Sequence, residues 1–188
     1  MIAEAGHFAL TLALFVAIVQ ASLPMIGAHR GNALWMSLDQ PSAMAQLLLV
    51  TLSFGCLTYS HVVSDFSVLN VVQNSHSMKP MLYKVAGVWG NHEGSLLLWV
   101  FILAAFGSAV AMFGSNLPPT LRARVLSVQA MISVGFYLFM LLTSNPFERV
   151  FPAAMDGRDL NPLLQDPGLA FHPPFLYLGY VGFSMAFS

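Results

Sequence analysis

The chain has 188 residues, of which 57% are apolar and 8% are charged, whereas ordinary soluble domains have roughly 25% charged residues. This balance excludes a soluble globular protein. The formal net charge of −1, without a basic cluster, excludes a nucleic-acid-binding protein, and the single cysteine, Cys56, excludes a disulfide framework.

Charged residues are absent from five long stretches, and these predict the membrane-spanning helices. The stretches are Ala5–His29, Gln40–Ser64, Gly94–Leu121, Val125–Phe147 and Pro167–Ser188. A helix needs about 20 apolar residues to cross a bilayer, because no water inside the bilayer can pair with its backbone. We therefore expect complete spans at about residues 6–28, 43–63, 94–113 and 125–143.

The fifth stretch begins with prolines, so its apolar part, Phe175–Ser188, is too short to cross the bilayer. It predicts an incomplete span at about residues 174–188. We therefore expect an all-α, polytopic integral membrane helical bundle with four complete transmembrane helices and the start of a fifth. Such a chain is expected to be the N-terminal fragment of a larger protein, or one piece of a split gene product.

The loops alternate between the two sides of the membrane. The N-terminus and the long loops at 64–93 and 144–173 fall on one side, and two short loops with Arg30, Arg122 and Arg124 fall on the other. The positive-inside rule counts basic residues in short loops, so it predicts that the short loops are cytoplasmic. The raw totals are closer, because the long loops carry Lys79, Lys84, Arg149 and Arg158.

Polar side chains cluster where the first two spans meet the side of the long loops. They are Glu4, His7, Tyr59, His61 and Asp65. We interpret them as interfacial anchors in preference to ligands. Within the five stretches there is no Asp, Glu, Lys or Arg, which disfavours a proton relay in this part of the protein.

The start of the third span combines a helix cap with aromatic residues. Asn91 is a good helix cap, and a helix from Trp89 would place Trp89, His92, Leu96 and Trp99 in one stripe. This stripe fits a platform for a flat aromatic ligand, and it fits an interfacial aromatic belt that packs on other helices equally well. Spacing alone leaves both interpretations open.

His172 directly precedes Pro173 and Pro174 at the expected start of the fifth span. Proline is tolerated in the first turn of a helix, so we expect His172 to be held extended at the membrane surface. The neighbouring aromatic residues are Phe171, Phe175, Tyr177 and Tyr180. An imidazole among aromatic rings suits axial ligation of a haem iron, although a lone histidine at this level is more often an anchor.

Three strings in the sequence closely resemble the CcmF family, the membrane haem lyases of cytochrome c maturation. They are VWGNHEGSLLLW, TSNPFERVF and GRDLNPLLQDPGLAFHPPFLYLGYVGFS. The resemblance covers the whole chain. It implies that the protein takes haem from the haem chaperone CcmE and, with partners that handle apocytochrome c, directs covalent haem attachment outside the cytoplasmic membrane.

In that family the histidine of the FHPP string coordinates haem, so the resemblance implies that His172 is an axial ligand to the haem iron. It also implies a periplasmic N-terminus in the bacterial inner membrane, or the mitochondrial inner membrane if the protein is organellar. The resemblance gives no role to the other five histidines, to Trp89 or to Glu93, and no catalytic residue is assigned.

We therefore expect haem handling and covalent haem attachment to apocytochrome c, with the lipid bilayer and the C-terminal part of the same protein as further partners. The chain alone is expected to be inactive. The alternative is a helical membrane transporter or a proton-translocating subunit. Charged residues in later spans would favour the alternative, and a Trp-rich outer segment followed by another histidine would favour the haem lyase.

Overall fold

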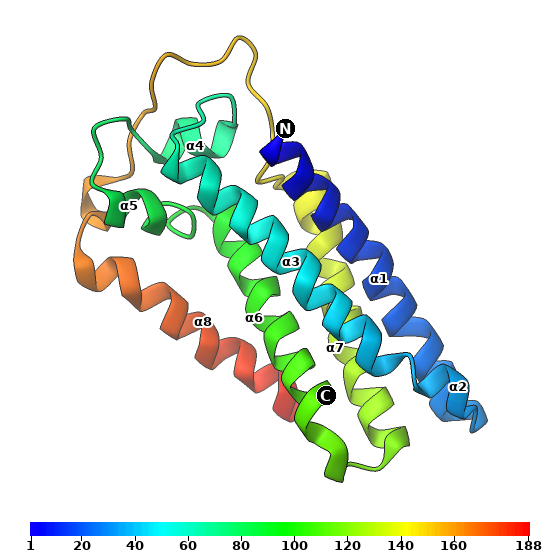
Figure 1. The fold of residues 1–188 in the computed structure, drawn as a ribbon. Coiled ribbons are helices and arrows are strands. Elements are labelled where there is room, and N and C mark those ends of the chain that lie inside the picture. The colour runs from blue at the N-terminus through cyan, green and yellow to red at the C-terminus, as the bar shows by residue number, and fades with distance from the viewer.

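The structure is a computed structural model that describes residues 1–188 and all side chains except those of Leu169 and Phe187. Five long helices dominate it (Figure 1). They are α1 (Ile2–Arg30), α3 (Asp39–Val62), α6 (His92–Phe113), α7 (Pro119–Thr143) and α8 (Pro167–Phe187). Among the described residues, the only β pairing is one bridge between Val68 and Arg149. The expected all-α class is confirmed.

Short helices connect the long ones. They are α2 (Ala33–Met36), α4 (Leu69–Asn74), α5 (Met81–Ala86) and the 3-10 turns η1 (Gly114–Asn116) and η2 (Pro162–Leu164). Four segments in the described chain are long and apolar enough to cross a membrane, namely Ile2–Arg30, Ala33–Val62, His92–Asn116 and Pro119–Thr143. Their outward-facing side chains include Phe8, Phe15, Leu48 and Leu142, which suit contact with lipid.

Helix α1 packs against α3 and α7 through a stripe of mostly small residues. Its buried positions include Ala3, Gly6, Leu10, Ala13, Ala17, Gln20, Pro24 and Gly27, which alternate steps of three and four residues. This heptad spacing keeps one face of the helix against its neighbours, and small side chains let the backbones approach closely. A Cβ atom at Gly6 would lie 2.5 Å from the Phe147 ring, so glycine is required there.

Neutral polar side chains tie the helices together inside the bundle. Gln46 Nε2 donates to Gln20 Oε1 at 2.7 Å, the Tyr137 hydroxyl donates to Gln46 Oε1 at 3.0 Å, and Gln20 Nε2 donates to the Leu126 carbonyl at 3.2 Å. This chain of hydrogen bonds joins α1, α3 and α7. It satisfies polar groups that the surrounding apolar side chains cannot.

One charged pair lies at the end of the bundle that carries α2 and η1. Arg122 Nε donates to Asp39 Oδ2 at 2.8 Å, and the side chain of Asp39 is 1% exposed. The pair joins the first turn of α3 to the first turn of α7. Arg122, which the sequence offers as a topology signal, therefore also has a packing role.

The N-terminus and the two long loops lie together at the other end, which we call the loop end (Figure 1). The loops pair through their backbones: Leu69 N–H donates to Glu148 at 2.8 Å, and Val150 N–H donates to Ser67 at 2.9 Å. Residues 63–91 and 144–166 thus form one layer over the bundle. The structure agrees with the expectation that these segments share a side, while their side of the membrane stays a prediction.

Helix α8 begins earlier than the sequence suggested. It starts at Pro167 and contains Pro173 and Pro174, so His172 lies in the helix and not in an extended segment before it. The expectation for the His172 backbone was wrong. Helix α8 slants across α6 and contacts it most closely toward the C-terminus (Figure 1).

Candidate functional site

His172 lies on the face of α8 that points away from the bundle. Ala170 and Val181 are buried and lie about 160° to 180° from His172 around the helix axis, at 100° per residue. His172 itself is exposed. The helix therefore directs the imidazole outward, near the loop end, where a ligand can reach it.

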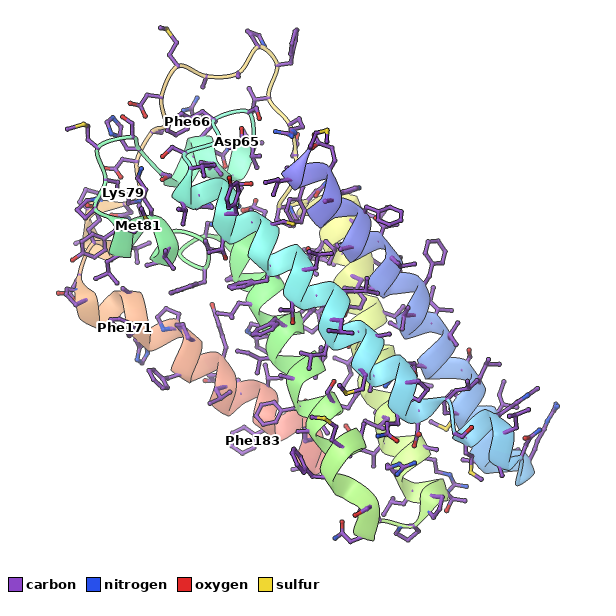
Figure 2. All side chains as sticks on the ribbon, viewed as in Figure 1. Asp65, Phe66, Lys79, Met81, Phe171 and Phe183 are labelled. Atoms are coloured by element: carbon purple, nitrogen blue, oxygen red, sulfur yellow. The ribbon has the colours of Figure 1, made fainter. Side chains whose placement is uncertain are left out.

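Apolar side chains continue this outward face toward the C-terminus. Leu176, Gly179 and Phe183 lie within about 40° of His172 around the axis, and Phe175 and Tyr180 flank them. Phe175 is 72% exposed and Tyr180 is 59% exposed. We call His172, Phe175, Leu176, Gly179, Tyr180 and Phe183 the His172 strip. Figure 2 shows Phe171 and Phe183 near the two ends of α8.

Gly179 makes the middle of the His172 strip flat. A Cβ atom built on Gly179 would meet nothing within 4 Å, so the glycine opens space on the helix surface, two turns beyond His172. An exposed imidazole above an open, apolar surface is an arrangement that can coordinate the metal of a flat cofactor and cover part of its ring.

Tyr177 does not belong to this surface. Its ring packs edge-on against Trp99 of α6, with centroids 6.0 Å apart and an interplanar angle of 61°. The expectation that Tyr177 flanks the imidazole was therefore wrong, because Tyr177 lies on the face of α8 that contacts the bundle. Phe171, Phe175 and Tyr180 remain exposed beside or below His172.

The aromatic stripe expected from Trp89 to Trp99 is not continuous. Helix α6 starts at His92, where Asn91 Oδ1 accepts a hydrogen bond from Gly94 N–H at 2.8 Å, so Trp89 lies in the preceding turn. Trp99 packs on Phe136 at 5.3 Å between ring centroids. The Asn91 cap is confirmed, and the packing interpretation of the stripe accounts for Trp99 better than a ligand platform does.

His61 is buried and does not act as an interfacial anchor. Its Nε2 lies 2.9 Å from Asn70 Oδ1, and Asn70 Nδ2 donates to Asn91 Oδ1 at 2.8 Å. Asn70 Nδ2 also lies 3.5 Å from Glu93 Oε2. This network fixes the loop layer to α3 and α6. The sequence did not reveal it, because Asn70 lies in the short helix α4 within the first long loop, and no local pattern places that helix against His61.

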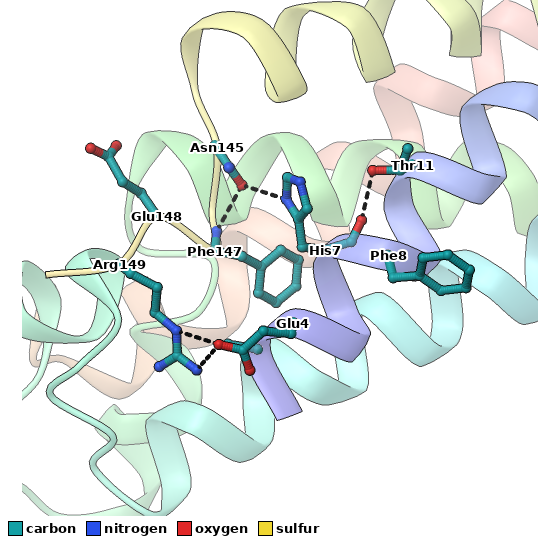
Figure 3. Close-up of a pocket in the computed structure, with 9 residues that line it drawn as sticks. Glu4, His7, Phe8, Thr11, Asn145, Phe147, Glu148 and Arg149 are labelled. Carbon is teal, nitrogen blue, oxygen red and sulfur yellow. Dashed lines mark hydrogen bonds and ion pairs between the residues drawn. The ribbon is translucent and has the colours of Figure 1, made fainter. Parts of the chain in front are cut away.

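A pocket of about 450 Å³ lies at the loop end beside the start of α1 (Figure 3). Inside this pocket His7 Nδ1 lies 3.3 Å from Asn145 Oδ1, and Arg149 Nε donates a hydrogen bond to Glu4 Oε1 at 2.8 Å. Ala3, Phe8 and Phe147 supply its apolar lining. The polar residues of the first span thus bind the second long loop. The N-terminus and the start of α8 lie apart (Figure 1), so His7 and His172 do not form one site.

Comparison with known proteins identifies relatives along the whole chain. A family model described as cytochrome C assembly protein matches residues 89–188, more than half of the chain. Over its full length the chain is 64% identical to cytochrome c-type biogenesis protein ccl1 of Rhodobacter capsulatus and 56% identical to cytochrome c-type biogenesis protein CcmF of Pseudomonas aeruginosa. It spans 29% of each of these relatives.

A solved structure named cytochrome c heme lyase CcmF shares the fold. The superposition has a TM-score of 0.86 at 24% sequence identity, and it covers 98% of this chain and 29% of that chain. The bundle, the loop layer and α8 therefore form an arrangement that recurs in a solved protein. On the match of the family model and the identity to these relatives, the chain belongs to the cytochrome c assembly protein family.

Proposed function

We propose that this chain serves in haem handling and in the covalent attachment of haem to apocytochrome c, and that His172 is an axial ligand to the haem iron. The observation that carries the proposal is the His172 strip, an outward imidazole above an open apolar surface. The names of the relatives, which are cytochrome c-type biogenesis proteins, favour this function over a transporter.

The residues of the strip fit haem as the substrate. Neutral imidazole offers a ring nitrogen to iron, Gly179 leaves room for a flat ring, and the exposed side chains of Phe175 and Tyr180 supply apolar contact. Haem brings the vinyl groups that react with the cysteine thiols of the apocytochrome. The chain contributes binding and orientation, which bring the reacting atoms together.

The location of His172 suits an exchange of haem at the membrane surface. The first turns of α8 lie beside α5 and the loop layer (Figure 1), and the density of arginine in the short connections favours a cytoplasmic location for the opposite end. In this proposal the loop end faces the periplasm across the bacterial inner membrane. The haem chaperone CcmE and apocytochrome c then approach the His172 strip from that side.

His172→Ala in the complete protein tests the function. Loss of a group that only supports a metal ligand costs about 10–100-fold in affinity or activity, so loss of the ligand itself should lower the yield of holocytochrome c by at least about tenfold. Haem-stained gels measure the yield, and immunoblots of membranes check insertion. His76→Ala is the matched control, because His76 also lies at the loop end and is partly exposed.

The opposing interpretation is an anchoring histidine at the membrane surface. Its replacement by alanine should cost at most about 1 kcal/mol and leave most of the activity. A yield of holocytochrome c close to that of the His76→Ala control would therefore overturn the assignment of His172.

A further inference from the structure

Pro174 leaves one carbonyl of α8 without its usual partner. In an α-helix the carbonyl of Ala170 accepts the N–H of residue 174, but proline has no N–H to donate. Ala170 is buried, so water does not satisfy this carbonyl, and an unpaired buried carbonyl is unfavourable. A partner from elsewhere in the chain is therefore needed at this position.

Trp89 supplies that partner. Its indole Nε1–H donates to the Ala170 carbonyl oxygen at 2.8 Å, across 81 residues of sequence. The bond therefore repairs the gap that Pro174 makes in the helix, and it attaches the turn two residues before His172 to the segment between α5 and α6.

The segment that carries Trp89 is itself firmly held. Trp89 N–H and Gly90 N–H donate to the Ala86 carbonyl at 3.2 and 2.9 Å, and the neighbouring Val88 is fully buried. Asn91, two residues later, caps α6 and joins the Asn70 network. The indole is therefore a fixed point against which α8 can be aligned.

A second contact holds α8 two turns further on. The Tyr177 ring packs on Trp99, and Val181 is buried against α6 and its neighbours. The turn that carries His172 lies between the Trp89 bond and this aromatic contact. Two attachments on one face of a helix set its rotation, so His172 is directed to the opposite, outward face.

We propose that Trp89 is a positioning residue for His172: its indole N–H replaces the amide that Pro174 lacks and thereby fixes the rotation of α8. The contacts above support the alignment of α8, whereas the effect of this alignment on haem binding by His172 rests on the proposed function. Trp89 is assigned no contact with haem.

Trp89→Phe removes the N–H and keeps an aromatic ring, so it isolates the hydrogen bond from the packing. Trp35→Phe is the matched control, because Trp35 lies in α2, apart from α8 (Figure 1), and its indole N–H makes no hydrogen bond within the part of the chain that the structure describes. Amide hydrogen exchange in the complete, haem-free protein is the first measurement. We expect exchange in residues 170–178 to rise about fivefold in Trp89→Phe, the ratio that matches one net hydrogen bond, and to stay unchanged in Trp35→Phe.

Pro174→Ala provides a second and independent test. Alanine restores an N–H that can bond the Ala170 carbonyl within the helix, so Trp89→Phe should raise the exchange much less in a Pro174→Ala background than in the wild type. An equal rise in both backgrounds would show that Trp89 acts through packing alone and would overturn the proposal. Unchanged exchange in Trp89→Phe would overturn it as well.

The absorption and electron paramagnetic resonance spectra of bound haem separate this proposal from the proposed function. If His172 binds iron and Trp89 aligns it, Trp89→Phe should shift the axial-ligand signals and Trp35→Phe should not. If exchange rises but the spectra do not depend on His172 at all, the alignment by Trp89 stands and the ligand assignment fails. If the spectra depend on His172 but exchange is unaffected by Trp89→Phe, the ligand assignment stands and the alignment fails.

Discussion

Asp156 fastens the second long loop to the first with a single carboxylate. Ser77 donates to it through its backbone N–H at 2.9 Å and its hydroxyl at 2.6 Å, and His76 Nε2 lies 3.4 Å away. The hydrogen bonds from the Ser77 hydroxyl and backbone, together with that from Gly157 N–H, lower the pKa of Asp156 from 3.8 to about 2. The ionised form is therefore the form that holds the loop.

This pKa predicts when the Asp156 contact between the two loops is lost. Because the pKa of Asp156 is lower in the folded protein, its contribution to stability is complete above the unfolded pKa near 3.8. That contribution is lost as the pH falls through the folded pKa of about 2. A fluorophore at Met155→Cys, an exposed position, should therefore keep its anisotropy from pH 7 to about pH 4 and become mobile only below that. The same probe in Asp156→Asn should be mobile already at pH 7. A transition of the parent protein above pH 4 would contradict this account.

At the scale of single residues, sequence patterns predicted features set by neighbouring residues, such as a helix cap. They did not predict contacts between side chains of different elements. The Asn91 cap follows from residue type and neighbouring sequence, and it is present. His61 was assigned to the interface because it ends an apolar stretch. Its burial depends on Asn70, which lies in the short helix α4. The position of α4 is set by how the first long loop folds against α3 and α6, and no spacing rule provides that.

Among the helices, α1, α3 and α7 depend on the Gln20, Gln46 and Tyr137 hydrogen bonds. Tyr137→Phe removes one hydroxyl and should destabilise the protein by about 0.6 kcal/mol, the average for such bonds in membranes. Gln46→Leu leaves both Gln20 Oε1 and the Tyr137 hydroxyl without a partner in the core, so it should cost more, about 2 kcal/mol.

Thermal unfolding of the purified protein in detergent measures both effects. Leu48→Ala is the control, because this side chain of α3 is exposed to lipid or detergent and its loss should change the melting temperature little. A smaller shift for Gln46→Leu than for Tyr137→Phe would contradict the shared role of Gln46.

The positions of the helices were predictable wherever charged residues mark the two ends of a long apolar stretch. The four helices that are long and apolar enough to span stand close to the charge-free stretches, since lipid excludes charged side chains from the middle of a spanning helix. The start of α8 was not predictable, because proline is tolerated in the first turn of a helix and disfavoured in its interior, where Pro173 and Pro174 lie. Trp89 removes part of that penalty by bonding the freed carbonyl, and this contact joins segments 81 residues apart.

For the whole molecule, the loop end and the end with η1 should face opposite sides of the membrane. Cysteines at Met155 and Asn116, both exposed, should react with an impermeant thiol reagent from opposite sides. Gly157 is unsuitable as a probe, because its Cβ would lie 1.9 Å from the Ser75 carbonyl oxygen. Cys56 is buried and should give little background. Labelling of Asn116→Cys from the periplasm would contradict the orientation.

The central claim, that His172 binds haem iron, is tested most directly by His172→Cys in the complete protein. Thiolate also ligates iron, so the variant should retain haem and show the altered absorption and electron paramagnetic resonance spectra of a thiolate ligand. His76→Cys is the control and should keep the wild-type spectrum. A haem spectrum in His172→Cys that is identical to the wild-type spectrum would contradict the account.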